Sequence, residues 1–363
     1  LSRIERGLRS ADNRFVLASI AEALRCSVAD LAGQPEAPVD RAGAEASSAV
    51  HETIRAAIEA DLRYGPTGAE APPIAHLERE LELVRDLRVA CDYRGASQRL
   101  PDLIRGLHAA AYGPDRPKAL RDLVIVADCA SFVVRYGGNP AGACLVAERA
   151  QQAAELLGDP VLLGLGAWSR AHAATGCGLY ERAYRIAEVG AAELEGHTGL
   201  PDAKEMLGQL WLTQAFALTA MSDTGEAAER VSAAEELAER TGDSPALRLA
   251  FGPTNNHLWR ISMEVDGGEA GRAVEIAREV KPAAIESTSR RAAFYLDTGR
   301  ALGRVGADVE AVRMLLTAER LAPQRIRQSP FAAEAVRSLL ERSQRNAAGV
   351  ELRGLCSRMG IPL

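Results

Sequence analysis

A short turn that recurs six times constrains this 363-residue chain more than any other feature of its sequence. Each turn follows a stretch of apolar residues at helical spacing and ends at an alanine that opens a second helical stretch. The turns span residues 91–96, 138–143, 178–183, 222–227, 268–273 and 306–311, and they close with Ala96, Ala143, Ala183, Ala227, Ala273 and Ala311. A small residue there lets two helices approach closely, so the sequence predicts a stack of helical hairpins.

These turns and alanines resemble tetratricopeptide (TPR) repeats over roughly residues 74–323. The alanines lie 38 to 47 residues apart, farther than the usual repeat of about 34, which implies longer helices or loops. The resemblance implies an all-α fold, a TPR-like right-handed α-solenoid that two helices within residues 330–359 close at one end. Composition agrees, because only 4% of the residues are aromatic, whereas strands favour aromatic and β-branched residues.

Residues 1–34 form a separate N-terminal unit. Apolar residues at helical spacing predict a helix over residues 12–25, and Ser27 to Asp30 has the pattern of a capping box that opens a short third helix. Residues 35–46 carry Pro, Gly, Ala and charges without a period, which predicts a linker. The repeat domain is then expected over residues 47–363, beginning with a helix over residues 47–64.

Three motifs in this unit resemble the second half of an Xre-type (Cro/CI-like) helix-turn-helix domain. They are Leu1-Ser2-Arg3-Ile4-Glu5-Arg6-Gly7, Ile20-Ala21-Glu22-Ala23-Leu24 and Cys26-Ser27-Val28-Ala29-Asp30-Leu31. The resemblance implies that a recognition helix ends near Gly7, that Ser2, Arg3, Arg6 and Arg9 lie close to DNA phosphates, and that the base-reading residues precede Leu1. The alternative is a generic three-helix cap on the solenoid.

The TPR resemblance also identifies candidate ligand contacts. It implies that the first helix of each hairpin faces a groove with residues about 18, 15 and 11 positions before the closing alanine, a spacing that keeps them on one helix face. The aromatic, amide and charged residues at such positions are Asp128, Phe132, Trp168, His172, Gln209, Phe216, Asn255 and Arg300. Amides and charges among aromatic rings suit a peptide or a small signalling molecule, although packed or solvated helix residues give the same pattern.

One run in the fifth unit has two interpretations. Phe251-Gly252-Pro253-Thr254-Asn255-Asn256 resembles an "FGPTN" run of actinobacterial regulators that join an Xre-type domain to TPR-like repeats. That resemblance adds Trp259, one turn after Asn255, to the candidate ligand contacts. The alternative is ordinary helix initiation, because Pro favours the first helical turn and Thr or Asn caps it.

Charge and missing motifs narrow the function classes. A net charge of −6 argues against a chain that coats nucleic acid or membrane by bulk positive charge. The sequence has no phosphate-binding loop of the Walker type, no nucleophile elbow and no HExxH pattern, and its six His and six Cys lack metal-ligand or disulfide spacing. We therefore expect a cytoplasmic, non-enzymatic protein without a cofactor, a metal or a membrane partner. Arginine greatly outnumbers lysine, which indicates a GC-rich genome or, less directly, an arginine-based ligand site.

The sequence as a whole predicts a ligand-responsive transcriptional regulator. Its N-terminal unit is expected to bind operator DNA, and its repeats a peptide or small-molecule effector. We expect a homodimer, because helix-turn-helix domains usually read two-fold sites, paired through the helix at 47–64 or the apolar stripe from Phe331 to Leu340. The alternative is a protein–protein adaptor with a vestigial DNA-binding domain.

Overall fold

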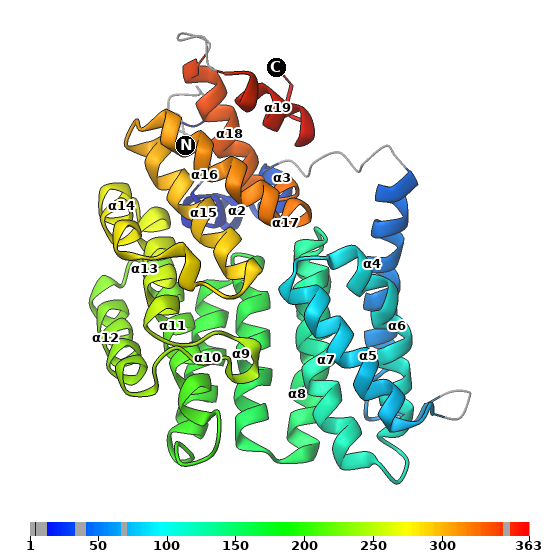
Figure 1. The fold of residues 1–363 in the computed structure, drawn as a ribbon. Coiled ribbons are helices and arrows are strands. Elements are labelled where there is room, and N and C mark those ends of the chain that lie inside the picture. The colour runs from blue at the N-terminus through cyan, green and yellow to red at the C-terminus, as the bar shows by residue number, and fades with distance from the viewer. Residues whose placement is uncertain (1–3, 5–12, 33–40, 67–70, 344–348, 363) are drawn as a thin grey trace.

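The chain is all-α wherever its structure is described, as the sequence predicts. The computed structural model describes residues 4, 13–32, 41–66, 71–343 and 349–362, and over these residues it contains helices and turns but no β-strand (Figure 1). Six helical hairpins make up most of it. They are α5 (Ile74–Val89) with α6 (Tyr93–Ala110), α7 (Arg116–Tyr136) with α8 (Pro140–Leu157), α9 (Pro160–Gly176) with α10 (Tyr180–Glu195), α11 (Ala203–Ala220) with α12 (Thr224–Thr241), α13 (Pro253–Gly267) with α14 (Ala270–Glu279), and α15 (Thr288–Arg304) with α16 (Asp308–Leu321).

All six predicted turns join the two helices of a hairpin, and they share one backbone geometry. Each has a residue with positive φ five positions before the closing alanine, which is Cys91, Gly138, Gly178, Ser222, Gly268 or Gly306. The N–H of the following residue then donates to a carbonyl in the last turn of the first helix, as Asn139 does to Val134 at 3.1 Å. This ends the first helix while satisfying its final carbonyls. Local sequence therefore sets where each hairpin folds back.

The closing alanines are buried, which explains why they are small. Ala96, Ala143, Ala183, Ala273 and Ala311 are fully buried, and Ala227 is nearly so. The first helices of the hairpins also contact one another in chain order and form one layer. We call this layer, which consists of α5, α7, α9, α11, α13 and α15, the odd row.

The two ends of the odd row meet. Helix α15 contacts α5, and the short 3-10 helix η1 (Ala246–Arg248) reaches the same helix. Arg248 forms ion pairs with Glu82 at 2.6 Å and with Asp86 at 2.5 Å. Beyond α15, Gln324 of α17 (Pro323–Arg327) donates to the Asp92 carboxylate at 3.0 Å. Residues more than 150 positions apart in the sequence thus tie the first hairpin to η1, before the fifth hairpin, and to α17, after the sixth.

The N-terminal unit contains two described helices, α2 (Arg14–Leu24) and α3 (Val28–Ala32). The predicted capping box is confirmed, because the Ser27 hydroxyl accepts from the Asp30 N–H at 3.1 Å while the Asp30 carboxylate accepts from the Ser27 N–H at 3.0 Å. Phe15 and Ala21 are buried, whereas Leu24 is exposed although its spacing predicted a buried position. The buried face of α2 is therefore centred closer to its N-terminus than the periodicity indicates.

Helix α4 (Arg41–Glu59) begins inside the segment predicted to be a linker, so residues 35–46 are only partly a connection. Alanine at positions 42, 44 and 46 favours helix, which outweighs Gly43. The predicted dimer stripe on this helix is partly used within the chain, since Val50 is buried and Ile54 is half-buried, whereas Ile58 is exposed. Val50 and Ile54 pack against glycines of the second hairpin.

The C-terminal part contains α18 (Pro330–Ser343) and α19 (Val350–Arg358), in agreement with the two predicted closing helices. Their apolar residues also face inward, because Val336 and Leu339 are buried in the common core. The second predicted dimer stripe is thus mostly covered by the chain itself. Between α14 and α15 lies a further 3-10 helix, η2 (Pro282–Ala284).

Candidate functional site

The N-terminus of helix α2 is attached to the odd row. Asn13, at this end of the helix, has two roles. Its side-chain oxygen caps the helix by accepting from the N–H groups of Phe15 and Val16, both at 3.0 Å. Its side-chain nitrogen donates to the carbonyl of Asp266 on α13 at 2.6 Å. One buried side chain therefore both starts α2 and fixes it to the array.

Arg14 continues this attachment through a network of alternating charges, the Arg14–Arg300 network. Arg14 pairs with Asp297 at 2.9 Å and Asp266 at 3.3 Å, and Arg300 pairs with the same two carboxylates at 2.8 and 2.5 Å. Ser262 donates to Asp297 at 2.9 Å and accepts from Arg14 at 3.1 Å. Burial alone would raise the pKa of Asp297, but Arg14 and Arg300 hold it below its ordinary value. Arg300, predicted to face a ligand, is fully buried in this network instead.

Phe15 places a ring among the aromatic residues of the array. Its ring contacts Tyr180 and Phe216 edge-on, at centroid distances of 5.3 and 5.2 Å, and Phe216 in turn contacts Trp259 at 5.7 Å. Helix α2 approaches closely because Gly178, which the turn also needs, has no side chain: a Cβ there would lie 2.9 Å from that of Ala18. The predicted ligand contact Phe216 therefore has α2 as its neighbour.

A second aromatic group joins α7 to α9. Phe132 stacks on His172 at 4.4 Å and on Trp168 at 5.6 Å, so these three predicted residues do come together. Asp128 lies one turn before Phe132, where it is buried and pairs with Arg88 at 3.5 Å. The Arg88 guanidinium lies 4.3 Å from the centre of the Phe132 ring.

Three further arginines lie around these rings, and we call Arg135, Arg290 and Arg325 the arginine cluster. Arg135 donates to the backbone carbonyl and to a ring nitrogen of His172, both at 2.6 Å. Arg325 lies 4.5 Å and Arg135 lies 5.6 Å from the centre of the same Tyr136 ring. Arg325 also donates to the Ser289 carbonyl at 2.9 Å. In the described part of the chain, no carboxylate forms an ion pair with any of the three.

The pKa values around the cluster differ. Burial acts to lower the pKa of Arg325, but Tyr136 and other nearby groups raise it above its ordinary value. Burial, followed by the repulsion of Arg325, lowers the pKa of Arg290 to about 10, which leaves it charged at neutral pH. Burial and Arg135 lower the pKa of His172 well below its ordinary value, so His172 is neutral and can accept from Arg135. Burial would raise the pKa of Tyr136, but the surrounding arginines bring it below its ordinary value.

The predicted amides have different surroundings. Gln209 is fully buried and donates to the Leu249 carbonyl at 3.0 Å, which fixes the segment before α13. Asn255 is also buried, but neither of its amide atoms has a hydrogen-bond partner among the described residues. One turn later on the same helix face, the indole N–H of Trp259 also lacks a partner there. The Arg290 guanidinium lies 5.4 Å from the centre of the Trp259 ring.

The run from Phe251 to Asn256 builds the start of α13. Phe251 is fully buried against Gly208, where a Cβ would lie only 2.1 Å from its ring. Asp243 accepts from both the backbone N–H and the hydroxyl of Thr254, at 3.1 and 2.7 Å, so the helix is capped by a residue outside the run. Pro253 begins the helix as the alternative predicts, but the prediction that Thr254 or Asn255 caps it is wrong. Helix initiation therefore does not account for the buried amide of Asn255.

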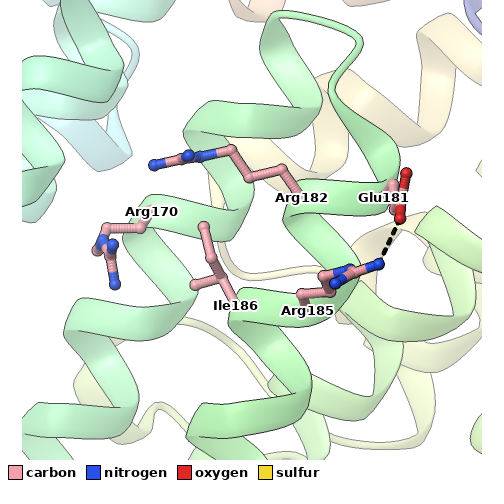
Figure 2. Close-up of a pocket in the computed structure, with 5 residues that line it drawn as sticks. All are labelled: Arg170, Glu181, Arg182, Arg185 and Ile186. Atoms are coloured by element: carbon pink, nitrogen blue, oxygen red, sulfur yellow. Dashed lines mark hydrogen bonds and ion pairs between the residues drawn. The ribbon is translucent and has the colours of Figure 1, made fainter.

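The described surface also has an arginine-lined pocket of about 420 Å³ between α9 and α10. Figure 2 shows Arg170, Glu181, Arg182, Arg185 and Ile186 around it. Arg185 pairs with Glu181 at 2.6 Å, and Arg170 pairs with Glu148 at 3.0 Å. Arg170 is two residues from both Trp168 and His172, which places it on the opposite side of α9 from those rings. Acidic neighbours thus already balance charge in this outer pocket.

The sequence analysis did not single out several residues that the structure brings together. These are Asn13, Arg14, Phe15, Arg135, Tyr136, Arg290 and Arg325. For the four arginines among them, the only signal was the excess of arginine over lysine. The predicted DNA contacts Ser2, Arg3, Arg6 and Arg9 lie outside the described residues.

No protein-family model, curated protein or solved structure matches this chain. Among the described residues, no three or more His, Cys, Asp and Glu side chains are grouped so that they could hold a metal ion. None of the helices in the described ranges combines the length and the apolar character needed to cross a bilayer.

Proposed function

We propose that this protein is a ligand-responsive transcriptional regulator. In this proposal α2 and α3 are the last helices of a helix-turn-helix domain, and the six hairpins form a TPR-like solenoid that binds an effector. The observation that carries it is the attachment of α2 to the odd row through Asn13, Arg14 and Phe15. The segment that resembles a DNA-binding domain is thereby fixed beside the candidate ligand contacts.

Shared helices would couple the two functions. Asn13 and Arg14 bind α13 and α15, and these helices also carry Trp259 and Arg290. An effector held by the latter residues changes the position of α2 only if it binds one arrangement of α2 more tightly than another. DNA affinity would then depend on the effector, because α2 packs against the recognition helix in the domain it resembles.

The proposal is tested with the complete chain expressed from its gene. We expect it to select a defined operator from a randomised duplex library and to bind that operator as a homodimer, with an affinity that falls steeply as salt rises. Replacing Arg3 and Arg6 by alanine should weaken binding to all sequences alike, since phosphate contacts carry no sequence information. A complete chain that binds no DNA but retains a protein partner would favour the adaptor instead.

A further inference from the structure

We propose that the arginine cluster binds a small, multiply charged oxyanion of the phosphate or carboxylate class. The site consists of Arg135, Arg290 and Arg325 together with the Trp259 and Asn255 side chains. That this anion is the effector rests on the function proposed above, but its binding can be measured without DNA.

The first argument is the way in which three distant segments converge. Arg135 ends α7, Arg290 lies in the first turn of α15, and Arg325 lies in α17. Closure of the odd row brings Arg135 and Arg325 to one Tyr136 ring. Arg290 lies against the Trp259 ring, close enough to Arg325 for the two charges to repel. Planar guanidinium groups bind phosphate and carboxylate oxygens in pairs, which makes them suitable for a ligand with several such oxygens.

The second argument is charge. Each neighbouring carboxylate already has its own arginine: Asp128 pairs with Arg88, and Asp297 pairs with Arg14 and Arg300. The described residues place no carboxylate within ion-pair distance of the cluster, although Asp297 attracts Arg325 from farther away. Among them, the Arg290 guanidinium has only an aromatic ring as a partner. Partly buried like charges repel one another, so an anion that neutralises them gains more than it would at a solvated surface.

The third argument is independent of charge. The Trp259 ring lies against Arg290, and Asn255 lies one turn earlier on the same face of α13. The Trp259 N–H and the Asn255 amide are both buried without hydrogen-bond partners in the described chain. Buried donors without a partner are costly. The Trp168 N–H and the Asn256 amide lack described partners as well, but Trp259 also lies against an arginine that pairs with no described carboxylate. An oxyanion at the arginine cluster could accept from them, which would satisfy these polar groups and the excess positive charge together.

The site suits a small ligand better than an extended one. Phe15 of α2 covers the neighbouring Phe216 ring, and the Phe132–Trp168–His172 stack borders the other side. The three arginines are themselves partly buried. A peptide laid along the odd row would have to displace α2, whereas a small anion would not.

The test measures binding of pyrophosphate and of citrate to the complete chain by titration calorimetry. Arg290→Gln is the main variant, because the Arg290 side chain makes no hydrogen bond that the fold would lose. Arg185→Gln, in the outer pocket of Figure 2, removes an equal charge from a pair that Glu181 already balances. Arg290→Lys keeps the charge, and circular dichroism confirms that each variant is folded.

We expect saturable binding of at least one probe by the wild-type chain. Arg290→Gln should weaken it at least about tenfold, Arg290→Lys less, and Arg185→Gln not at all. Binding of pyrophosphate alone would assign the phosphate class, and binding of citrate alone the carboxylate class. Failure of both probes, equal binding by Arg290→Gln and wild type, or stronger binding of an oligoglutamate peptide would overturn the proposal.

Operator binding measured with and without the probe separates this inference from the proposed function. A probe that binds but leaves operator binding unchanged supports the anion site and contradicts its role as effector site. Operator binding by a chain that binds neither probe contradicts the anion site alone.

Discussion

Two arginine-rich regions lie on the same row of helices and differ in one respect. In the Arg14–Arg300 network two arginines share two carboxylates, and each charge has an opposite neighbour. The arginine cluster has three guanidinium groups and no carboxylate among the described residues. Balanced charges hold helices together without any other molecule. The cluster arginines have carbonyl, imidazole and aromatic partners within the chain, but their positive charge is not neutralised by an ion pair in its described part. Under the proposal made above, this difference separates a structural contact from a binding site.

The largest effect is expected from breaking the balanced network. Asp266→Asn keeps the size of the side chain but leaves the buried Arg300 with half of its compensating charge. We expect a loss of about 3–5 kcal/mol in the free energy of unfolding, measured in urea. The control Glu181→Gln breaks the exposed pair with Arg185 and should change the free energy of unfolding little. A similar small change for Asp266→Asn would mean that the network is not structural.

A smaller and more local effect is expected from Arg14→Ala. Arg300 keeps both of its carboxylates, so the array should remain intact while α2 loses its charged attachment. We expect the α2 attachment to lose about 1.5–3 kcal/mol, seen as faster amide exchange at residues 15–24 with unchanged exchange in α9. Glu22→Ala, at an exposed position of the same helix, is the control. Faster exchange throughout the array would show that α2 is part of its core.

Acid should weaken the balanced network specifically. Because the pKa of Asp297 is lowered on folding, its contribution is complete above the ordinary aspartate value and is lost as the pH falls through the lowered one. We expect the wild-type unfolding free energy to fall more steeply between about pH 4 and pH 2 than that of Asp297→Asn. Parallel curves for the two proteins would contradict the assigned role of Asp297.

The smallest expected effect is a slight gain, rather than a loss, in the free energy of unfolding. In buffer without a multivalent anion, Arg290→Gln removes a repelling charge and should leave the unfolding free energy unchanged or raise it by less than about 1 kcal/mol. Thermal unfolding in a chloride buffer measures this. A large loss of stability would show that Arg290 is needed by the fold, and that the cluster resembles the balanced network after all.

The features that could be predicted from the sequence are those determined by interactions between residues close together in the chain. The closing alanines, the turn residues such as Gly138 and the Ser27–Asp30 capping box act within a few residues of themselves, so their patterns are readable along the chain. The start of α4 was placed too late because the alanines from position 42 to 46 favour helix in a segment whose Pro and Gly suggested a linker.

The candidate site could be predicted only in part. The spacing rule brought Phe132, Trp168 and His172 together because they belong to neighbouring hairpins. It could not show that Arg300 is enclosed by Asp266 and Arg14, since Arg14 and Asp297 are 283 residues apart in sequence. Arg325 was missed for the same reason, because it belongs to α17 but lies 4.5 Å from the centre of the Tyr136 ring of α7.

That closure also has a mechanical consequence. In a repeat array with free ends each unit contacts only its neighbours, so one unit can bend without changing the contacts of the others. Here the ion pairs of Arg248 with α5 and the hydrogen bond from Gln324 to Asp92 connect later parts of the chain back to the first hairpin, so the array is closed. A closed array cannot widen at one place without straining the contacts that close it. We therefore expect a displacement at the contact between α2 and α13 to reach α5 in two ways. One runs through the successive helices of the odd row, and the other through the contacts of Arg248 and Gln324 with the first hairpin.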